Sequence, residues 1–350
     1  MAQEAATAPL PPAGRPAQVG AAPFERRYPA RHTYGALDLG TNNCRLLIAR
    51  PSEDGFTVID AFSRVVRLGE GLAASGRIAD EAMDRAVAAL GVCAEKLKRR
   101  RVSLARSVAT EACRRAVNGR HFVERVRRET GIALEIISPE EEARLAMLGC
   151  HRLLEPGDGP ALIFDIGGGS TELVLIDTDG GGIPKIQCWW SAPWGVVSLT
   201  ESEGRDFAEP GERLAAFGRM KERVRHAFRR FSELLPADRS NIRLLGTSGT
   251  VTTLASVHLA LPSYDRRAVD GLMMPADSMR AVNARLSAMS HAERAQLPCI
   301  GAERADLVVA GCAILEAIMD IWPARTLGVA DRGIREGILR SLMARDGHKL

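Results

Sequence analysis

The sequence lacks the cysteine and histidine patterns that hold structural metal ions. Its 350 residues include seven cysteines and seven histidines, scattered along the chain. No Cys-x-x-Cys pair occurs, and no two histidines lie at the helical spacing of a metal-binding pair. An odd number of dispersed cysteines also gives no disulfide framework. The sequence therefore predicts neither a structural zinc site nor a disulfide-stabilised secreted domain.

Long apolar runs and a strong charge imbalance are also missing. No stretch is long enough to span a bilayer, and residues 1–33, rich in Ala, Pro and Gly, lack the apolar segment of a secretory signal. We therefore expect a disordered tail over residues 1–33, a cytoplasmic location and no membrane partner. The net charge of +4 is modest, so we expect no nucleic-acid partner. The chain is long enough for two ordinary globular domains.

The segment FDIGGGSTELVLI, residues 164–176, places three consecutive glycines between two apolar stretches. A hairpin turn needs only one or two residues that accept positive φ. A third glycine, followed by Ser170 and Thr171, indicates a loop whose backbone a ligand approaches closely. Exposed N–H groups in such a loop bind anionic oxygens. Taken alone, the segment is equally consistent with an ordinary tight turn.

A second segment repeats this pattern. ALDLGTNNCRLLIA, residues 36–49, aligns without a gap with IFDIGGGSTELVLI, residues 163–176, and Asp38 falls on Asp165. Each copy consists of an apolar strand, an aspartate, a turn of small polar residues and a second apolar strand. The repeat predicts a duplicated domain in which each half contributes one hairpin loop. Two facing loops could hold a phosphate chain from both sides, and the paired aspartates could hold a cation.

The segment ISPEEEARLAMLG has the strongest helix start in the chain. Ser138 is a good N-cap, and Glu141 three residues later completes a capping box. Glu140 can pair with Arg144 four residues on. Glu142 is left without a structural role at the head of the apolar stripe. It is either paired at a domain junction or available to a substrate.

Strands and helices alternate along the rest of the chain. We predict a strand near residues 57–67, a helix over residues 80–101 and a strand over residues 104–109. CWWSAPWGVVSLTE is interpreted as a strand and a turn, and a basic helix is expected around residues 215–235. IRLLGTSGTVTTLASV predicts a strand, a turn and a helix whose N-terminus can bind an anion.

Two further features have a structural and a functional interpretation. The run KLKRRR is either a polyanion-binding patch or a solvated helix end that complements the helix dipole, and we favour the second. Trp189, Trp190 and Trp194 are interpreted as packing residues rather than as a stacking platform.

Taken together, the motifs resemble those of the exopolyphosphatase and guanosine pentaphosphatase (Ppx/GppA) family. They are, in order, ALDLGTNNCRLL, ATEACRRAVNG, ISPEEEARLAMLG, FDIGGGSTELVLI, LLGTSGT and ADRGIREGIL. The resemblance covers about Thr33 to the C-terminus. It implies an α/β fold with two ribonuclease-H-like domains of the actin, sugar kinase and heat-shock ATPase superfamily around a central cleft. We expect these domains over residues 34–140 and 141–332, with a C-terminal helix at about 333–346 that packs back on the first.

The resemblance also implies roles for particular residues. Glu142 would be the base that activates the attacking water, and Glu172 the second acid, which helps to position water or metal. Asp165 and Asp38 would hold Mg²⁺, mostly through water. Arg114 would grip the phosphate chain, with its neighbour Arg115 ranked second. The remaining phosphate-binding residues would be Thr41, Asn42, Gly168, Gly169, Ser170, Gly246, Ser248, Gly249 and Thr250.

The implied function is that of an exopolyphosphatase, which uses Mg²⁺ to release terminal phosphate from inorganic polyphosphate. The first alternative is a guanosine pentaphosphate phosphohydrolase with the same catalytic groups. Another is a polyphosphate or alarmone sensor without turnover, which would not need both Glu142 and Glu172. A third is a sugar kinase, for which no sugar or adenosine motif is visible. Substrate preference, oligomeric state (a homodimer is one option), cellular role and the tail's role stay open.

Two departures from the family pattern limit what the resemblance implies. The first loop reads Gly40-Thr41-Asn42-Asn43, where relatives often have Gly-Ser-Asn-Ser, so one hydroxyl is lost and the role of Asn43 is uncertain. Longer relatives carry an additional C-terminal helical region. Because this region has no counterpart in the sequence, the resemblance does not imply processive gripping of very long polymers, and processivity stays open.

Overall fold

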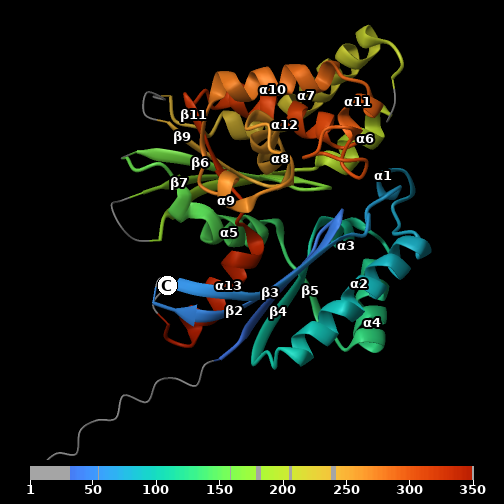
Figure 1. Cartoon of the computed structure of the whole chain (residues 1–350), viewed down its shortest axis with the longest axis vertical. Coiled ribbons are helices and arrows are strands. Elements are labelled where there is room, and N and C mark those ends of the chain that lie inside the picture. Colours follow the sequence, from blue (N-terminus) through green and yellow to red (C-terminus); the bar gives the residue numbers. More distant parts are fainter. Residues whose placement is uncertain are drawn as a thin grey trace, which may run out of the picture. The chain divides into compact units, whose positions relative to one another are not determined.

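Two β-sheets form the framework of the protein (Figure 1). The computed structural model describes residues 32–53, 55–157, 159–178, 183–204, 207–237 and 242–348. The first sheet has the order β3-β2-β1-β4-β5 and the second the order β10-β11-β9-β6-β7-β8. The strands of the first sheet are β1 (Tyr34–Leu39), β2 (Asn43–Ser52), β3 (Gly55–Val65), β4 (Leu104–Ala109) and β5 (Leu134–Ile136). Those of the second are β6 (Pro160–Ile166), β7 (Thr171–Asp177), β8 (Lys185–Ala192), β9 (Arg243–Thr247), β10 (Met273–Pro275) and β11 (Thr326–Ala330).

The two sheets repeat one topology. In the first, β1, β2 and β3 form an antiparallel meander, and β4 and β5 follow in parallel on the other side of β1. In the second, β6, β7 and β8 form the meander, and β9 and β11 follow in parallel beside β6. The short strand β10 is an antiparallel addition at the edge. The predicted α/β fold with two related sheets is confirmed, and the hairpin repeat is part of a larger duplication.

Helices cover both sheets. Those up to the middle of the chain are α1 (Leu72–Ser75), α2 (Asp80–Arg99), α3 (Glu111–Arg115), α4 (Gly119–Thr130), α5 (Pro139–Cys150) and the 3₁₀ turn η1 (His151–Leu153). The rest are α6 (Val196–Glu203), α7 (Pro210–Ser232), α8 (Gly249–His258), α9 (Arg266–Val269), α10 (Ala276–Ala288), α11 (His291–Ala295), α12 (Val308–Ile321) and α13 (Ile334–Arg345). In the described part of the chain, no helix has both the length and the apolar character needed to cross a membrane.

Helix α6 was not predicted, because its start depends on a tertiary contact. The sequence was interpreted there as a strand followed by a turn. The N–H groups of Val196 and Val197, in the first turn of α6, donate to the carbonyl oxygens of Gly167 and Gly168, at 3.0 and 2.8 Å. These bonds satisfy N–H groups that a helix normally caps with a local side chain. Helix α6 is therefore anchored on the glycine hairpin.

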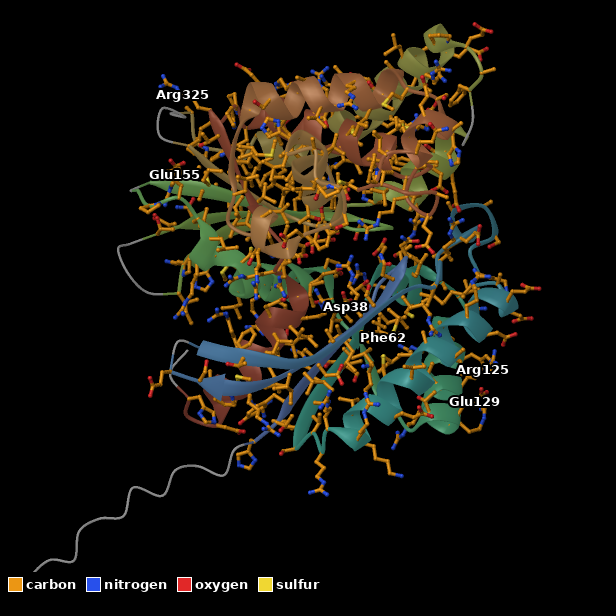
Figure 2. The ribbon with its side chains drawn as sticks, viewed as in Figure 1. Asp38, Phe62, Arg125, Glu129, Glu155 and Arg325 are labelled. Carbon is orange, nitrogen blue, oxygen red and sulfur yellow. The ribbon has the colours of Figure 1, made fainter. Side chains whose placement is uncertain are left out.

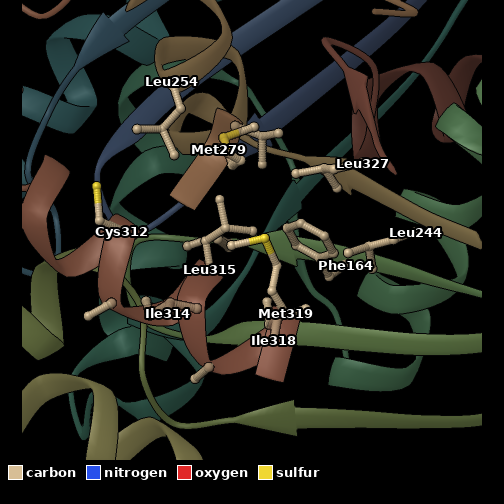
Figure 3. Packing of buried hydrophobic residues seen from close by; sticks show 14 of the residues in the cluster. Phe164, Leu244, Leu254, Met279, Cys312, Ile314, Leu315, Ile318, Met319 and Leu327 are labelled. Carbon is tan, nitrogen blue, oxygen red and sulfur yellow. The ribbon is translucent and has the colours of Figure 1, made fainter. Parts of the chain in front are cut away.

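The core of the second half forms around α12, most of whose residues are buried. Ile314, Leu315 and Ile318 belong to one apolar cluster with Phe164 of β6 and Leu244 of β9 (Figure 3). A helix that is apolar on nearly every face is stable only when it is enclosed by other elements. Burial of α12 thus fixes β6, and with it the glycine hairpin that follows.

Helix α13 packs against α5 and against the first sheet. Ile338 and Met343 of α13 belong to one apolar cluster with Tyr34 of β1 and Leu47 of β2. The contact with α5 is close, because a Cβ atom at Gly337 would lie 2.0 Å from the carbonyl oxygen of Leu145. Only glycine permits this approach. The packing holds α5, which carries Glu142, in a fixed position.

The predicted ion pairing at the start of α5 was wrong in part. The N–H of Glu141 donates to the Ser138 hydroxyl at 3.2 Å, which is half of the capping box. The Glu141 carboxylate, however, binds Arg144 and Arg106. Arg144 therefore pairs with Glu141 and not with Glu140. The competing cation, Arg106 on β4, comes from outside the helix and could not be found from local spacing.

The remaining structural interpretations agree with the packing. Lys96, Arg99 and Arg100 of the KLKRRR run all bind Asp60 of β3, at 2.7, 3.4 and 2.8 Å. These cations therefore have an internal partner, which supports the interpretation as a helix end. Trp189, Trp190 and Trp194 pack against apolar clusters of the second half.

The chain start differs in one respect from the expected tail over residues 1–33. Residues 1–31 lie outside the described residues. Thr33 is buried, and its N–H donates to the hydroxyl of Ser103 at 3.4 Å. The domain limits at 140 and 332 stay a prediction.

Candidate active site

A pocket of about 150 Å³ lies between the two hairpin turns. The β1–β2 and β6–β7 turns form two of its walls, and the start of α8 and the loop before α12 form others. Glu142, near the start of α5, reaches it from the domain junction. Of the predicted site residues, the pocket is lined by Asp38, Thr41, Asn42, Glu142, Asp165, Gly168, Gly169, Ser170, Ser248, Gly249 and Thr250.

The two turns have the same geometry. The N–H of Gly40 donates to the Asn43 carbonyl oxygen at 2.9 Å, and the N–H of Gly167 donates to that of Ser170 at 3.0 Å. Each bond closes a tight turn. The two middle residues of each turn are left exposed to the pocket. Within the described residues, the N–H groups of Thr41, Asn42, Gly168 and Gly169 donate to no other group. Unpaired N–H groups in a turn are suited to bind anionic oxygens.

The turns also touch each other, and glycine makes this contact possible. A Cβ atom at Gly168 would lie 2.9 Å from Cβ of Thr41 and 3.2 Å from the backbone nitrogen of Asn42. Such distances are shorter than real Cβ contacts. The glycines of the second turn therefore bring its N–H groups close to those of the first.

The first of the two aspartates ahead of the turns, Asp38, is poorly satisfied by the protein. Oδ1 of Asp38 and Oδ1 of Asn42 are buried, and neither has a hydrogen-bond partner among the described residues. Burial raises the pKa of Asp38 above its usual range. Burial, together with the nearby carboxylates of Glu172 and Asp38, raises the pKa of Asp165 to about 8. Acidic groups in such an environment are typical of functional sites.

Glu142 presents one carboxylate oxygen to the protein. Nη1 and Nη2 of Arg114 both donate to Oε2 of Glu142, at 3.1 and 3.2 Å. Oε1 accepts no hydrogen bond from the described residues. Burial and the neighbouring Glu172 raise the pKa of Glu142 well above its usual value, although Arg114 acts in the opposite direction. The side chain is only 8% exposed and faces the pocket.

Glu172 lies behind the pocket wall and does not line it. It stands directly opposite Asp165 in the β6–β7 ladder. Its Oε1 accepts a hydrogen bond of 2.8 Å from the Ser191 hydroxyl of β8. Burial raises the pKa of Glu172 to about 7, against the lowering effect of hydrogen bonds from Ser170 and Ser191.

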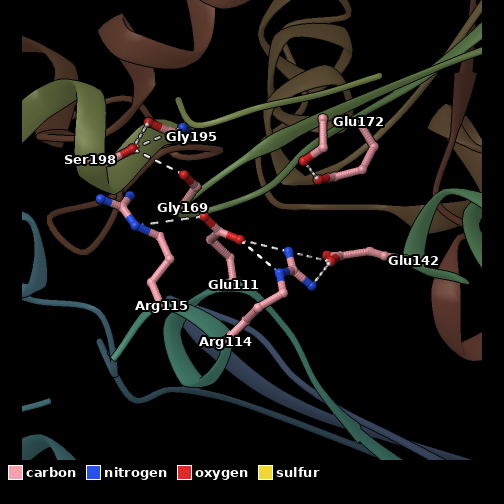
Figure 4. A network of polar contacts seen from close by, with 9 residues as sticks. Glu111, Arg114, Arg115, Glu142, Gly169, Glu172, Gly195 and Ser198 are labelled. Atoms are coloured by element: carbon pink, nitrogen blue, oxygen red, sulfur yellow. Dashed lines mark hydrogen bonds and ion pairs between the residues drawn. The ribbon is translucent and has the colours of Figure 1, made fainter. Parts of the chain in front are cut away.

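Arg114, on α3, does not line the pocket either, but it binds a residue that does. Its guanidinium bridges Glu142 and Glu111 (Figure 4). Burial by itself would lower the pKa of Arg114, but Glu142 and Glu111 outweigh it and the net shift is upward. Arg115 does not line the pocket, and its Nε lies 3.8 Å from Oε1 of Glu111.

One predicted phosphate ligand has a packing role instead. Gly246, in β9, does not line the pocket. A Cβ atom there would lie 2.4 Å from the ring of Phe164. The glycine thus makes room for a core aromatic ring.

The pocket contains charged residues that the sequence reasoning missed. Arg45 lies directly opposite Asp38 in the β1–β2 ladder. The gapless repeat aligns Arg45 with Glu172, so a comparison of the two copies could have found it. Glu111 stands three residues before Arg114 and could have been found as its partner. Arg304 comes from an irregular loop. Its sequence contains no recognisable motif from which a role in the pocket could have been predicted.

The donor set fits a hard divalent cation. No group of three or more His, Cys, Asp or Glu side chains in the described ranges is placed to enclose a metal ion. Mg²⁺ does not require such a cage, because it usually keeps several waters and binds one or two carboxylates together with substrate phosphate. The unsatisfied Asp38 oxygen and the buried Asp165 carboxyl supply these oxygens. Asp38 lies in the interior, whereas Arg125 and Glu129 of α4 lie near the surface (Figure 2).

Comparison with known proteins shows the family of the chain. The model of the Ppx/GppA phosphatase family matches residues 47–346. Exopolyphosphatase 2 of Mycobacterium tuberculosis is 32% identical over 321 residues, covering 88% of this chain and 97% of that protein. The crystal structure of the Aquifex aeolicus Ppx/GppA family member is 29% identical, with a TM-score of 0.74, and covers 91% of this chain and 100% of that one.

An exopolyphosphatase from Cytophaga hutchinsonii shares the fold. It is 24% identical, with a TM-score of 0.78, and the match covers 91% of this chain and 99% of that one. The family model and the mycobacterial relative each span most of this chain. The chain therefore belongs to the Ppx/GppA phosphatase family and is a phosphoanhydride hydrolase.

Proposed function

We propose that this protein is an exopolyphosphatase that releases terminal phosphate from inorganic polyphosphate and depends on Mg²⁺. The observation that carries the proposal is the carboxylate of Glu142, which faces a pocket lined by unpaired N–H groups. A base beside anion-binding donors is the arrangement that hydrolysis of a phosphate chain requires. The name of the mycobacterial relative supports polyphosphate as the substrate.

The turns would bind the terminal phosphoryl group. The N–H groups of Thr41, Asn42, Gly168 and Gly169 donate to its oxygens. The N-terminus of α8, with Ser248 and Thr250, contributes further donors to the chain. Arg114 adds a full positive charge. Phosphoryl transfer depends mainly on such positioning and on neutralisation of charge.

Glu142 would act as the general base. Its Oε1 takes a proton from a water molecule while the water oxygen forms a bond to the terminal phosphorus. The bond from that phosphorus to the bridging oxygen breaks, and the bridging oxygen leaves with the electron pair as the new end of the shortened chain. The proton on Glu142 then passes to solvent. The raised pKa of Glu142 favours this role, because a more basic carboxylate accepts the proton more readily.

Asp165 and Asp38 would hold Mg²⁺, and Glu172 would orient water or the metal's water ligands. When bound, Mg²⁺ neutralises charge on the phosphate oxygens. It would also relieve the mutual repulsion of the buried acids, which explains why the protein tolerates them together. The cytoplasmic location and the homodimer stay predictions from the sequence.

The experiment that tests the proposal compares three substrates side by side. Phosphate release is measured with polyphosphate, guanosine pentaphosphate and ATP, each with Mg²⁺ and with a chelator. We expect the highest kcat/KM for polyphosphate and no turnover without the metal. A higher kcat/KM for guanosine pentaphosphate would establish the first alternative. Binding of polyphosphate without phosphate release from any of the three would establish the sensor.

A further inference from the structure

The carboxylate of Glu111 connects the two arginines of α3. Oε2 accepts hydrogen bonds from Nε and Nη2 of Arg114, at 3.0 and 2.6 Å. Oε1 lies 3.8 Å from Nε of Arg115 (Figure 4). The side chain is 12% exposed and borders the pocket. An acid beside a polyanion-binding pocket would repel its ligand, so its presence there requires an explanation.

Glu111 also supports the glycine turn of the second hairpin. A Cβ atom at Gly169 would lie 3.0 Å from Cγ of Glu111 and 3.4 Å from its Cβ. The turn therefore lies directly on the methylene groups of Glu111. One side chain thus contacts both the arginine that is proposed to bind phosphate and the turn that is proposed to bind the same phosphate.

The remaining contacts of Arg114 show what Glu111 contributes. Nη1 of Arg114 donates to the Ile137 carbonyl oxygen at 2.8 Å and to Glu142. Nε is bound by Glu111 alone among the described residues. Nε and Nη2 belong to one rigid fork of donors, and both converge on Oε2 of Glu111, which restricts the orientation of the guanidinium. Without Glu111, the guanidinium of Arg114 would be held, within the described part of the chain, only through Nη1 and Nη2, by Ile137 and Glu142.

We propose that Glu111 is a positioning residue that holds the guanidinium of Arg114 beside the Gly168–Gly169 turn, so that both bind the same terminal phosphate. The inference rests on the proposed function of this pocket. Glu111, which lines the pocket, acts on the phosphate through the guanidinium of Arg114 that it binds. Its negative charge is offset by Arg114 and Arg115, which limits the repulsion of the phosphate chain.

Glu111→Gln tests the proposal through the sign of its effect on KM. Glutamine keeps the methylene groups under Gly169 but loses the negative charge that pairs with the guanidinium of Arg114. We expect KM for polyphosphate to rise on the order of tenfold, with a smaller change in kcat. If Glu111 acted only as a repelling charge, its removal would lower KM. An unchanged or lower KM therefore overturns the proposal.

A double-mutant cycle with Arg114→Ala tests whether Glu111 acts through that arginine. In the Arg114→Ala background, we expect Glu111→Gln to change KM by less than about twofold. A tenfold effect that persists in that background would contradict the proposal. Glu111→Asp keeps the charge and should retain part of the affinity, and it replaces Glu111→Gln if the latter does not fold by circular dichroism. Glu135→Gln, which removes an exposed partner of Arg106, is the matched control and should leave KM unchanged.

A binding measurement separates this inference from the proposed function. Calorimetric titration with inorganic tripolyphosphate gives a Kd without requiring turnover. We expect Glu111→Gln to raise this Kd by roughly tenfold, as it raises KM. If the unmodified protein bound tripolyphosphate and released no phosphate from any substrate, the proposed function would fail while the role of Glu111 could still be measured. An unaltered Kd would overturn the role of Glu111 whether or not the protein is a hydrolase.

Discussion

Asp165 of β6 lies directly opposite Glu172 of β7, so the second hairpin presents two carboxylates on one face. The matching pair in the first hairpin is Asp38 and Arg45. The duplicated frame therefore carries two acids in one copy and an acid with a cation in the other. This difference places the guanidinium of Arg45 in the site, where burial lowers its pKa, although Asp38 and Asp165 are close enough for their charges to act in the opposite direction. The charges of the site, and not its backbone, distinguish the two halves.

Glu142→Gln should abolish most of the turnover and leave the fold intact. Glutamine cannot take a proton from water, and loss of a general base costs about 10² to 10⁴ in rate. The N-cap bond of α5 goes to the N–H of Glu141, so the helix start is unaffected. Arg114 keeps Glu111 as a partner. We expect phosphate release at least about a hundredfold slower, and tripolyphosphate binding that is equal or tighter. Turnover at the parent rate would show that Glu142 is structural, and Glu172 would be the next candidate.

Asp165→Asn should weaken the response to Mg²⁺. A neutral amide oxygen replaces a carboxylate, which is the better ligand for a hard cation. We expect lower turnover, a higher Mg²⁺ concentration for half-maximal activity and a smaller rise in Tm on addition of Mg²⁺. Asp84→Asn, at an exposed ion pair with Arg125, is the control. Equal Mg²⁺ dependence of turnover and of Tm in mutant and parent would exclude Asp165 from the metal site.

Gly168→Ala should separate the two turns. The added methyl group would lie 2.9 Å from Cβ of Thr41, so one of the two turns must move by a few tenths of an ångström or more. Displacement of this order in a positioned site reduces kcat/KM by roughly tenfold to a hundredfold. Gly211→Ala, in α7, is the matched control, because nothing lies within 4 Å of its added Cβ. Equal steady-state kinetics for the two variants would mean that the contact between the turns does not matter.

Glu172→Gln should change how stability depends on pH. The pKa of Glu172 is raised from the usual 4.5 to about 7, mainly by burial. Between these values the folded protein keeps a proton that the unfolded chain has lost. The stabilisation from this group is therefore complete below about pH 4.5 and is lost as the pH rises through about 7.

Urea denaturation in the presence of a chelator measures this effect. From about pH 5 to about pH 8, we expect the unfolding free energy of Glu172→Gln to gain about 1–3 kcal/mol relative to the parent. A constant difference across this range would show that the Glu172 carboxyl has an ordinary pKa in the folded protein.

The local pattern of the sequence was sufficient to predict the two hairpins, the capped start of α5 and the strand, turn and helix around Ser248. These features depend on neighbours in the chain, such as glycine in a tight turn or Ser138 bonded to the N–H three residues later. The gapless repeat of the hairpins also predicted a second sheet like the first. Both sheets have the same topology, so the duplication extends beyond the two hairpins.

Only the tertiary structure decided which charges meet. Glu111 lies beside the Gly169 turn, although the two residues are distant in the sequence. Glu141 binds both Arg144 of its own helix and Arg106 of β4, which comes from a distant part of the chain. Arg304 reaches the pocket from a loop with no pattern at all. Electrostatic interactions and burial depend on distance in space, and chain folding brings these side chains together from separate elements. The sequence by itself therefore determined the backbone elements of the site, whereas its network of charges was determined by how those elements pack.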